Sequence, residues 1–291
     1  MLSVLIPTYN WNALQLVYKL QKQLEKENCI YEIIVLDDAS KSELTIYNQE
    51  INKIPNCFFE ELPVNMGRSK IRNMLAQRAN YDWLLFLDAD VDPVSEKFIS
   101  IYLSEINKKK KVIVGGIAYS KCEGNGNLRW KQGKQSEEKR IEERIKLPYK
   151  YFFTGNFLIE KETFYQIYFD ETIREYGYED LVFSKQLEKH NIQVWQILNE
   201  VYHLGIDENA AFISKTKEAL QNLVLLIKEK KLTVKDVKIM QVYRKIQFLR
   251  LPFILHFFAE SFEKRAEKKS SLFYYQLFRL AYLHKVIKNM L

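Results

Sequence analysis

The chain has 291 residues, of which 47% are apolar and 28% charged, close to the averages of folded globular proteins. This composition excludes a disordered chain and a polytopic membrane protein, and the length suffices for one large domain or two smaller ones. The net charge of +7 is unevenly distributed, because residues 228–291 contain 15 Lys and Arg but 5 Asp and Glu. Such a basic segment indicates an anionic partner, either nucleic acid or acidic lipid.

The cysteines and the N-terminus bear on the cellular compartment. Cys29, Cys57 and Cys122 show no Cys-x-x-Cys spacing, which argues against a disulfide framework or a zinc site. The chain starts directly with a strand-like segment, Leu2–Ile6, without the basic and apolar regions of a signal peptide. We therefore expect no export signal and a reducing, cytoplasmic location.

Five apolar, β-branched or aromatic segments are predicted to be strands: 2–6, 31–36, 57–61, 83–87 and 112–118. Between them, the spacing of Leu16, Leu20 and Leu24 predicts a helix that ends near Lys26. This alternation of strands and helices predicts a largely parallel sheet with helices on both faces.

Residues 120–150 interrupt this pattern. Gly124–Asn127 is a turn cluster, and Ser136–Lys146 is a dense mixture of Glu, Lys and Arg. We expect a mobile loop with a short solvated helix here.

The C-terminal segments 215–231 and 234–291 are predicted to be helical. Within them, Ile246–Phe258 is strongly apolar but is interrupted by Arg250 and is too short to span a hydrocarbon core of ~30 Å at ~1.5 Å per residue. Its flanking basic and aromatic residues fit a helix lying in a membrane interface. The alternative is a helical hairpin packed on the N-terminal domain or on a second subunit.

Asp88 and Asp90 follow the predicted strand 83–87. In an open α/β sheet, ligands bind at the carboxyl ends of the strands. If the chain is extended here, both carboxylates point to one side and Ala89 to the other. Mg²⁺ and Mn²⁺ take such oxygen ligands together with substrate phosphates, so we predict a metal–nucleotide site. The alternative is a turn that merely uses Asp.

Further short motifs occur in a fixed order around this pair. They are Val4–Asn10, Ile33–Ser40, Asn65–Asn73, Phe153–Asn156, Gly177–Leu181 and Val201–Leu204. Together they resemble the glycosyltransferase family 2 pattern on the GT-A fold, over about residues 2–205. The resemblance implies a Rossmann-like α/β domain over 1–214 with a mostly parallel central sheet. The basic, aromatic-rich region 215–291 lies outside it and is expected to be a helical extension.

The resemblance implies a nucleoside-diphosphate sugar as the donor, with UDP favoured. Thr8, Tyr9 and Asp38 would then hold uracil, because a carboxylate accepts the N–H of the base. Pro7 and Gly67 shape turns at the strand ends, and backbone groups freed at these turns can also contact a flat base. The alternative for the Asp pair ending at Asp38 is a turn or a helix N-cap.

Arg68, Lys70 and Arg72 precede a helix-like stretch, where a diphosphate could meet cations and a helix N-terminus. The alternative is a solvated helix face. We favour phosphate or base contact for Arg72 and the surface for Lys70.

In the family pattern, the first Asp of the Asp-x-Asp motif touches ribose and the second binds the metal that bridges the diphosphate. The resemblance therefore assigns Asp88, with Ala89, to the donor site and Asp90 to the metal. Asp88 and His203 are the further candidate metal ligands, and imidazole suits Mn²⁺ better than Mg²⁺. The alternative for His203 is a structural role.

Glu179 and Asp180 are the catalytic candidates. Glycosyl transfer with inversion needs one base for the acceptor hydroxyl proton. The resemblance assigns Asp180 as this base and Glu179 as a positioning group. The alternative is an N-cap, and we expect the helix N-terminus to lower the pKa of the carboxylate. Trp130 would flank the acceptor, with Gly155 and Asn156 beside the donor sugar, under a loop that closes to exclude water.

These features predict an inverting, metal-dependent glycosyltransferase that acts on a glycan or lipid-linked acceptor in surface polysaccharide biosynthesis. A nucleotidyltransferase is the first alternative, although Pro7–Asn10 is not its usual Gly-rich signature. A non-catalytic sugar-nucleotide-binding module is the second, although the carboxylates are all present. No recognition motif supports nucleic-acid binding, so we expect none. Residues 228–291 would instead contact an anionic membrane on its inner face or form a homodimer.

Overall fold

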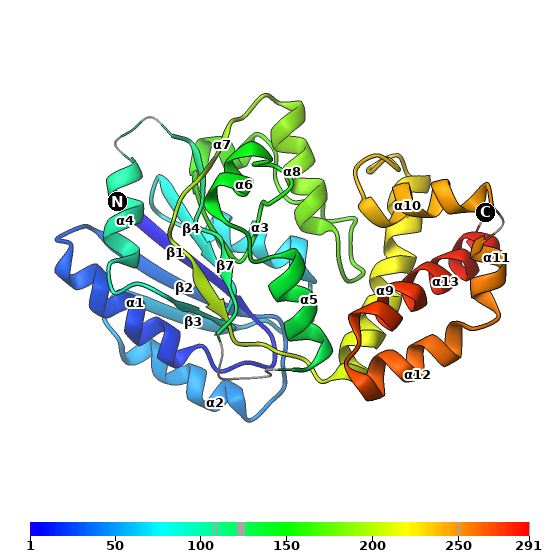
Figure 1. Ribbon diagram of the computed structural model, residues 1–291. Helices are drawn as coiled ribbons and strands as arrows, with labels where there is room; N and C mark the ends of the chain where they lie inside the picture. The colour runs from blue at the N-terminus through cyan, green and yellow to red at the C-terminus, as the bar shows by residue number, and fades with distance from the viewer. Residues whose placement is uncertain (107, 109, 121–125, 250, 291) are drawn as a thin grey trace. The chain divides into compact units, whose positions relative to one another are not determined.

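The computed structural model describes residues 1–106, 108, 110–120, 126–249 and 251–290. The chain forms two compact units (Figure 1). The first comprises Met1–Ser120, Glu137–Arg174 and Glu179–Gly205, and the second comprises Lys121–Ser136, Glu175–Tyr178 and Ile206–Leu291. The second unit thus takes in two internal segments as well as the C-terminal region.

The first unit is built on a seven-stranded sheet in the order β3-β2-β1-β4-β8-β6-β9. Strand β8 runs antiparallel to both of its neighbours, and the other pairs are parallel. This arrangement confirms the predicted α/β fold with a mostly parallel sheet. The strands are β1 (Leu2–Thr8), β2 (Tyr31–Asp37), β3 (Cys57–Glu61), β4 (Trp83–Leu87), β6 (Val112–Val114), β8 (Asn156–Glu160) and β9 (Val194–Gln196).

The fifth predicted strand, 112–118, is wrong as a single element. It splits into β6 and β7 (Ile117–Ala118), which belong to different sheets. Gly116, between them, has φ +93°, a conformation that favours glycine. Strand β7 joins β10 (Val201–His203) and β5 (Val91–Pro93) in a small second sheet.

The sheet is covered on both faces, as its alternating side chains require. Leu2, Val4 and Ile6 of β1 pack in one core with α1 (Leu14–Lys26) and α4 (Phe98–Ile106). Leu5 belongs to the opposite core, which includes side chains of α3 (Arg68–Arg78), α7 (Lys161–Tyr165) and α8 (Glu179–Lys189). The predicted end of the first helix near Lys26 is confirmed. The other helices of this unit are α2 (Leu44–Gln49), a 3₁₀ turn (Glu50–Lys53) and α6 (Ile141–Lys146).

The charged segment 136–146 is more ordered than predicted. Its C-terminal part forms α6, and Arg144 in this helix is buried. Arg144 donates hydrogen bonds to the carbonyls of Gly115 (3.0 Å) and Ile197 (2.9 Å) and pairs with Glu200 at 2.9 Å. The short helix expected in this segment is thus present, and its residues other than Arg144 are exposed or partly exposed. Residues 124 and 125 of the predicted turn cluster lie outside the described residues.

The second unit is helical, as predicted for the C-terminal region. Its helices are α5 (Leu128–Ser136), α9 (Asn209–Lys228), α10 (Lys238–Gln247), α11 (Leu251–His256), α12 (Ala259–Lys269) and α13 (Leu272–Met290). Phe212, Tyr275 and Phe278 are among the residues of its core. The apolar run 246–258 is not one helix, because α10 ends within it and α11 forms a separate short helix. No helix in the described part of the chain is long and apolar enough to cross a membrane.

Candidate functional site

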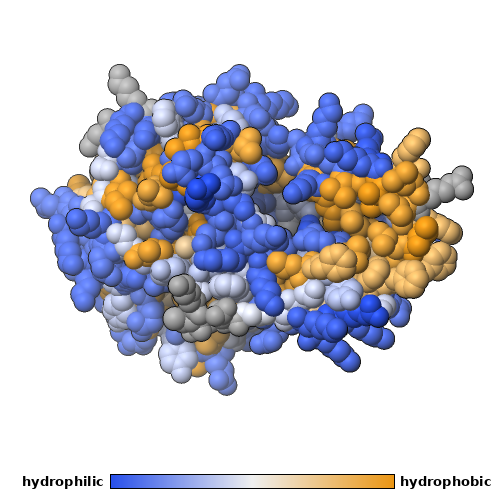
Figure 2. All heavy atoms as spheres, viewed as in Figure 1, coloured by the Kyte–Doolittle hydropathy of each residue, from blue (hydrophilic) through white to orange (hydrophobic). Residues whose placement is uncertain are grey.

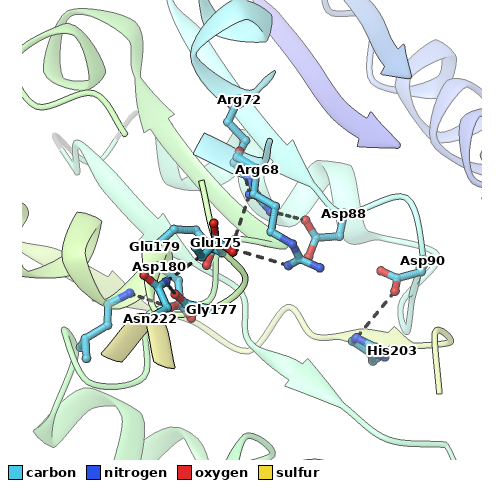
Figure 3. A network of polar contacts seen from close by, with 11 residues as sticks. Arg68, Arg72, Asp88, Asp90, Glu175, Gly177, Glu179, Asp180, His203 and Asn222 are labelled. Carbon is cyan, nitrogen blue, oxygen red and sulfur yellow. Dashed lines mark hydrogen bonds and ion pairs between the residues drawn. The ribbon is translucent and has the colours of Figure 1, made fainter. Parts of the chain in front are cut away.

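Asp88 and Asp90 lie in a turn between β4 and β5, so the extended chain expected from their alternation is wrong. Burial raises the pKa of Asp90, and the negative charge of the nearby Asp88 adds a smaller increase. The Asp88 carboxylate pairs with Arg72, with Oδ1 2.7 Å from Nη2 (Figure 3). Ala89, between the two, is buried.

The small second sheet brings His203 to Asp90. Strands β10 and β5 are antiparallel, with His203 opposite Val91, and the Leu204 N–H donates to the Asp90 carbonyl at 2.8 Å. As a result, His203 Nε2 lies 3.8 Å from Asp90 Oδ2 (Figure 3). His203 stacks on Tyr119, with ring centroids 5.7 Å apart, and its buried Nδ1 has no hydrogen-bond partner among the described residues.

Two glycines make room for the carboxylates. A Cβ atom on Gly155 would lie 2.5 Å from Asp88 Oδ2, and one on Gly205 would lie 2.0 Å from Asp90 Oδ2. A side chain at either position would therefore displace a carboxylate. Gly155 was predicted near the donor, and the structure gives it this spacing role. Gly205 was not predicted, although a glycine two residues after a candidate ligand was a usable signal.

The residues around Asp90 suit a divalent cation. An oxygen and an imidazole nitrogen face each other, a donor set that Mn²⁺ accepts. Within the described ranges, no group of three or more His, Cys, Asp or Glu residues could hold a metal ion by itself. Phosphate oxygens would thus have to complete the coordination, which is usual for Mg²⁺ and Mn²⁺ with nucleotides. The third predicted ligand, Asp88, is held by Arg72.

Arg72 connects the Asp88 region to the start of α8. It is buried in α3, its Nη1 lies 3.9 Å from Glu179 Oε1, and its guanidinium lies over the Phe169 ring at 5.6 Å. Arg68, one turn earlier and half-exposed, places Nη1 3.6 Å from the same Glu179 oxygen. Arg68 and Arg72 of α3 thus lie beside the carboxylates of Asp88 and Glu179, which come from separate parts of the sequence (Figure 3).

Asp180 lies in the first turn of α8, beside Glu179, and its Oδ1 accepts the Leu181 N–H at 2.7 Å. Desolvation by the surrounding protein, and then the negative charge of Glu179, raise the pKa of Asp180 to about 7. The expectation that the helix N-terminus lowers this pKa is therefore wrong, because these two effects are larger. A carboxylate with this pKa is suited to accept a proton near neutral pH.

The residues predicted to bind the nucleobase lie at the carboxyl ends of β1 and β2, where Thr8 is opposite Asp37 in the parallel strand register. The Asp38 carboxylate accepts the N–H groups of Met66 (2.6 Å) and Gly67 (2.9 Å), and Gly67 has φ +83°. Asp38 thus fixes the turn that leads into α3. Each of its oxygens keeps a second lone pair for a ligand.

The neighbouring residues at this edge differ in exposure. The Thr8 hydroxyl is buried and donates to the Trp11 carbonyl at 3.2 Å. Tyr9 is exposed, and Pro7 is half-buried. Tyr9 is thus the side chain of the three that is most open to a ligand.

Asn156, predicted beside the donor sugar, is fully buried at the start of β8. Its amide group donates to the carbonyls of Gly116 and Asn199, each at 2.8 Å, and its Oδ1 accepts the Tyr102 hydroxyl at 2.6 Å. These bonds favour a structural role for Asn156. Trp130, the predicted acceptor contact, lies in α5 of the second unit, so that role stays a prediction.

We expect Asn156→Ala to lower the free energy of unfolding by about 3 kcal/mol, because it removes three buried hydrogen bonds. Chemical denaturation measures this change. Asn289→Ala, at an exposed position of α13, is the control and should be neutral. A variant that is as stable as the parent but binds donor poorly would show instead that Asn156 contacts the ligand.

Comparisons with known proteins agree with this arrangement. The family model described as "Glycosyl transferase family 2" matches residues 3–176. The chain is 24% identical to chondroitin synthase of Pasteurella multocida over 64% of its own length and 23% of that protein. It spans between 22% and 32% of the length of the curated relatives that it matches.

Two solved structures share the fold. Mannosyltransferase PcManGT from Pyrobaculum calidifontis, in complex with GDP-Man and Mn²⁺, is 12% identical with a TM-score of 0.57, over 99% of this chain and 86% of that chain. S. aureus TarS in complex with UDP-GlcNAc is 16% identical with a TM-score of 0.51, over 99% of this chain and 91% of that chain.

Proposed function

The chain belongs to glycosyl transferase family 2, and we propose that it is an inverting, metal-dependent enzyme that transfers a sugar from a UDP-sugar to a glycan or lipid-linked acceptor. The observation that carries this proposal is the position of Arg72. It pairs with Asp88, which is assigned to the donor, and lies near Glu179, the neighbour of the candidate base Asp180. One arginine thus contacts both the donor residues and the catalytic segment. Transfer needs donor and acceptor groups at this proximity.

We assign the donor to the edge formed by the ends of β1, β2 and β4. Tyr9 and Asp38, with Pro7 and Thr8, would hold the base, and Asp88 would contact the ribose. Arg68 and Arg72, in the first turns of α3, would bind the diphosphate, which the helix N-terminus also attracts. The UDP-GlcNAc complex of TarS supports this choice of donor.

Asp90 and His203 would hold a divalent cation, Mn²⁺ or Mg²⁺. Such an ion, when bound, stabilises negative charge on the departing diphosphate. The Mn²⁺ complex of PcManGT supports the assignment, as does the facing pair of oxygen and imidazole donors in this chain.

Asp180 would act as the base. Its carboxylate takes the acceptor hydroxyl proton while that oxygen bonds to the anomeric carbon and the bond from this carbon to the diphosphate breaks, which inverts the configuration. Glu179, held by Arg68 and Arg72, would position the reacting hydroxyls. Arg68 and Arg72 would also offset charge on the leaving diphosphate.

We place the reaction in surface polysaccharide biosynthesis, which the similarity to chondroitin synthase supports. The enzyme would act in the cytoplasm, peripherally on the inner face of an anionic membrane, through residues 228–291. The family membership disfavours a nucleotidyltransferase, and the presence of Asp38, Asp88, Asp90 and Asp180 disfavours a non-catalytic module.

A donor screen tests this function. Thermal shift and hydrolysis are measured with UDP-, GDP- and dTDP-sugars, with and without Mn²⁺. We expect a UDP-sugar to give the largest stabilisation and the fastest hydrolysis, in both cases with Mn²⁺. Preference for another nucleotide would contradict the UDP assignment, and no response to any sugar nucleotide would contradict the proposed function.

A further inference from the structure

The short helix α11 and its flanking residues expose large apolar side chains to solvent. Phe248 is 91% exposed and Phe257 is 70% exposed, whereas Pro252 is buried. Figure 2 shows a broad apolar area over the part of the second unit where α11 and α13 lie. We call the exposed residues the α11 patch: Phe248, Leu249, Leu251, Phe253, Ile254, Phe257 and Phe258. A contiguous apolar surface of this kind marks an interaction site.

Positive charges flank the α11 patch. Arg244 and Lys245 are exposed at the end of α10, and Lys285 and Lys288 are exposed on α13, which packs against α11. None of these four side chains forms a salt bridge with a described residue. The sequence contains no Asp or Glu from 237 to 259 or from 268 to 291. The charge around the patch is therefore mainly positive, and Glu260 of α12, two residues after Phe258, is the exposed carboxylate beside it.

We infer that the α11 patch inserts into the interfacial region of an anionic lipid bilayer. Exposed Phe, Leu and Ile side chains enter the boundary between headgroups and acyl chains, while the neighbouring Lys and Arg bind the acidic headgroups. A cavity of about 350 Å³ lined by Gln247, Pro252, Phe253 and His284 offers additional space to a lipid chain. The inference rests on the membrane association proposed above and is independent of the sugar chemistry.

A second copy of the chain fits this surface less well. In a two-fold dimer the patch would face its own copy, because such an interface uses the same surface twice. Arg244, Lys245, Lys285 and Lys288 of both protomers would then gather at one interface, in excess over Glu260, the exposed carboxylate next to Phe258. Juxtaposed like charges oppose association, whereas an anionic bilayer neutralises them.

The test uses point substitutions in the full chain. Removing the residues beyond about 225 would also uncover α9, whose Phe212 shares a core with Tyr275 and Phe278. In contrast, Phe248→Ser/Phe257→Ser and Arg244→Gln/Lys245→Gln change exposed side chains. Matched controls are Phe58→Ser on β3 and Lys22→Gln/Lys26→Gln on α1, which are also exposed.

Co-sedimentation is measured with phosphatidylcholine vesicles, with and without phosphatidylglycerol, at low and high salt. We expect the parent chain to bind the anionic vesicles and to be released by salt. The double Phe variant should bind on the order of 100-fold more weakly, from the lost burial of two Phe side chains. The charge variant should bind roughly 30-fold more weakly, from the loss of two cations. The controls should bind as the parent does.

Three results would overturn the inference: no binding of the parent chain, equal losses in variants and controls, or a salt-insensitive dimer that Phe248→Ser/Phe257→Ser dissociates. Sedimentation velocity detects the dimer. Hydrolysis of a sugar nucleotide in solution should be unchanged in the patch variants, because the patch lies outside the assigned site. A chain that binds vesicles but responds to no sugar nucleotide would contradict the proposed chemistry and leave this inference standing.

Discussion

Asp180→Asn should lower the turnover number by about 10²–10⁴-fold, the usual contribution of a general base, with little change in donor affinity. The substitution keeps the shape of the side chain, and the Asn oxygen can still accept the Leu181 N–H that Asp180 accepts at 2.7 Å. It removes only the group that takes the acceptor proton. Steady-state kinetics with a saturating donor, together with donor titration, separates the two effects.

The pH dependence provides an internal control. Asp180 has a pKa of about 7, so the parent enzyme should lose activity as pH falls through this value and the carboxylate becomes protonated. Because this pKa is raised above its ordinary value of 3.8, the folded state holds the proton more tightly and loses stability as pH rises from about 4 to about 7. Asp180→Asn lacks this loss of stability. The melting temperature of the variant should therefore rise relative to that of the parent as pH increases over this range.

The opposite pattern would reassign the residues. Near-normal turnover in Asp180→Asn with a large loss in Glu179→Gln would exchange the two roles. A product that retains the anomeric configuration would contradict a mechanism with a single base.

The fold could be predicted from sequence where local patterns are strong. The bounds of the observed strands β1 to β4 agree closely with the predicted strands 2–6, 31–36, 57–61 and 83–87. They could be predicted because buried parallel strands form continuous apolar runs. The segment 112–118 differs from these by its Gly115-Gly116 pair, a local turn signal, and the strand divides at this pair. A Cβ atom on Gly115 would lie 2.3 Å from the Asn199 carbonyl, which a local pattern cannot indicate.

The candidate site shows the same limit. The motif order indicates Asp88, Asp90, Glu179 and His203 as site residues, and all four lie in ion pairs that the structure describes. Their partners depend on long-range packing. Arg72, for which the sequence favoured a phosphate or base contact, also pairs with Asp88, and no local pattern indicates that pair.

Asp180 illustrates why sequence is a poor guide to pKa. Its position in the first turn of a helix predicts a lowered value, but the desolvation that raises it arises from the folded surroundings. Local position supplies the helix effect alone. This desolvation arises only once distant segments have packed around the carboxyl group.

Asp90→Ala should abolish the stimulation of transfer by Mn²⁺, a loss on the order of 10³-fold if the ion supplies several kcal/mol to the transition state. The variant should also reduce the affinity for UDP in Mn²⁺ to the value measured without metal, because the diphosphate then lacks its largest counter-charge. The fold should persist, since the substitution removes a carboxylate whose pKa burial already raises.

Asp92→Ala is the matched control for this prediction. Asp92 lies two residues further along, in β5, where it pairs with Lys19 at 2.8 Å. It should therefore lose little stability, as is usual for a partly exposed ion pair, and keep its full response to Mn²⁺. Isothermal titration of UDP with and without Mn²⁺ measures the metal response without relying on turnover. Undiminished activity of the parent enzyme in a chelator, or an equal loss of the metal response in both variants, would remove Asp90 from the metal site. A loss of the metal response in Asp90→Ala but not in Asp92→Ala, together with a smaller loss in His203→Ala, would assign the cation to Asp90 and His203, whose donor atoms lie 3.8 Å apart.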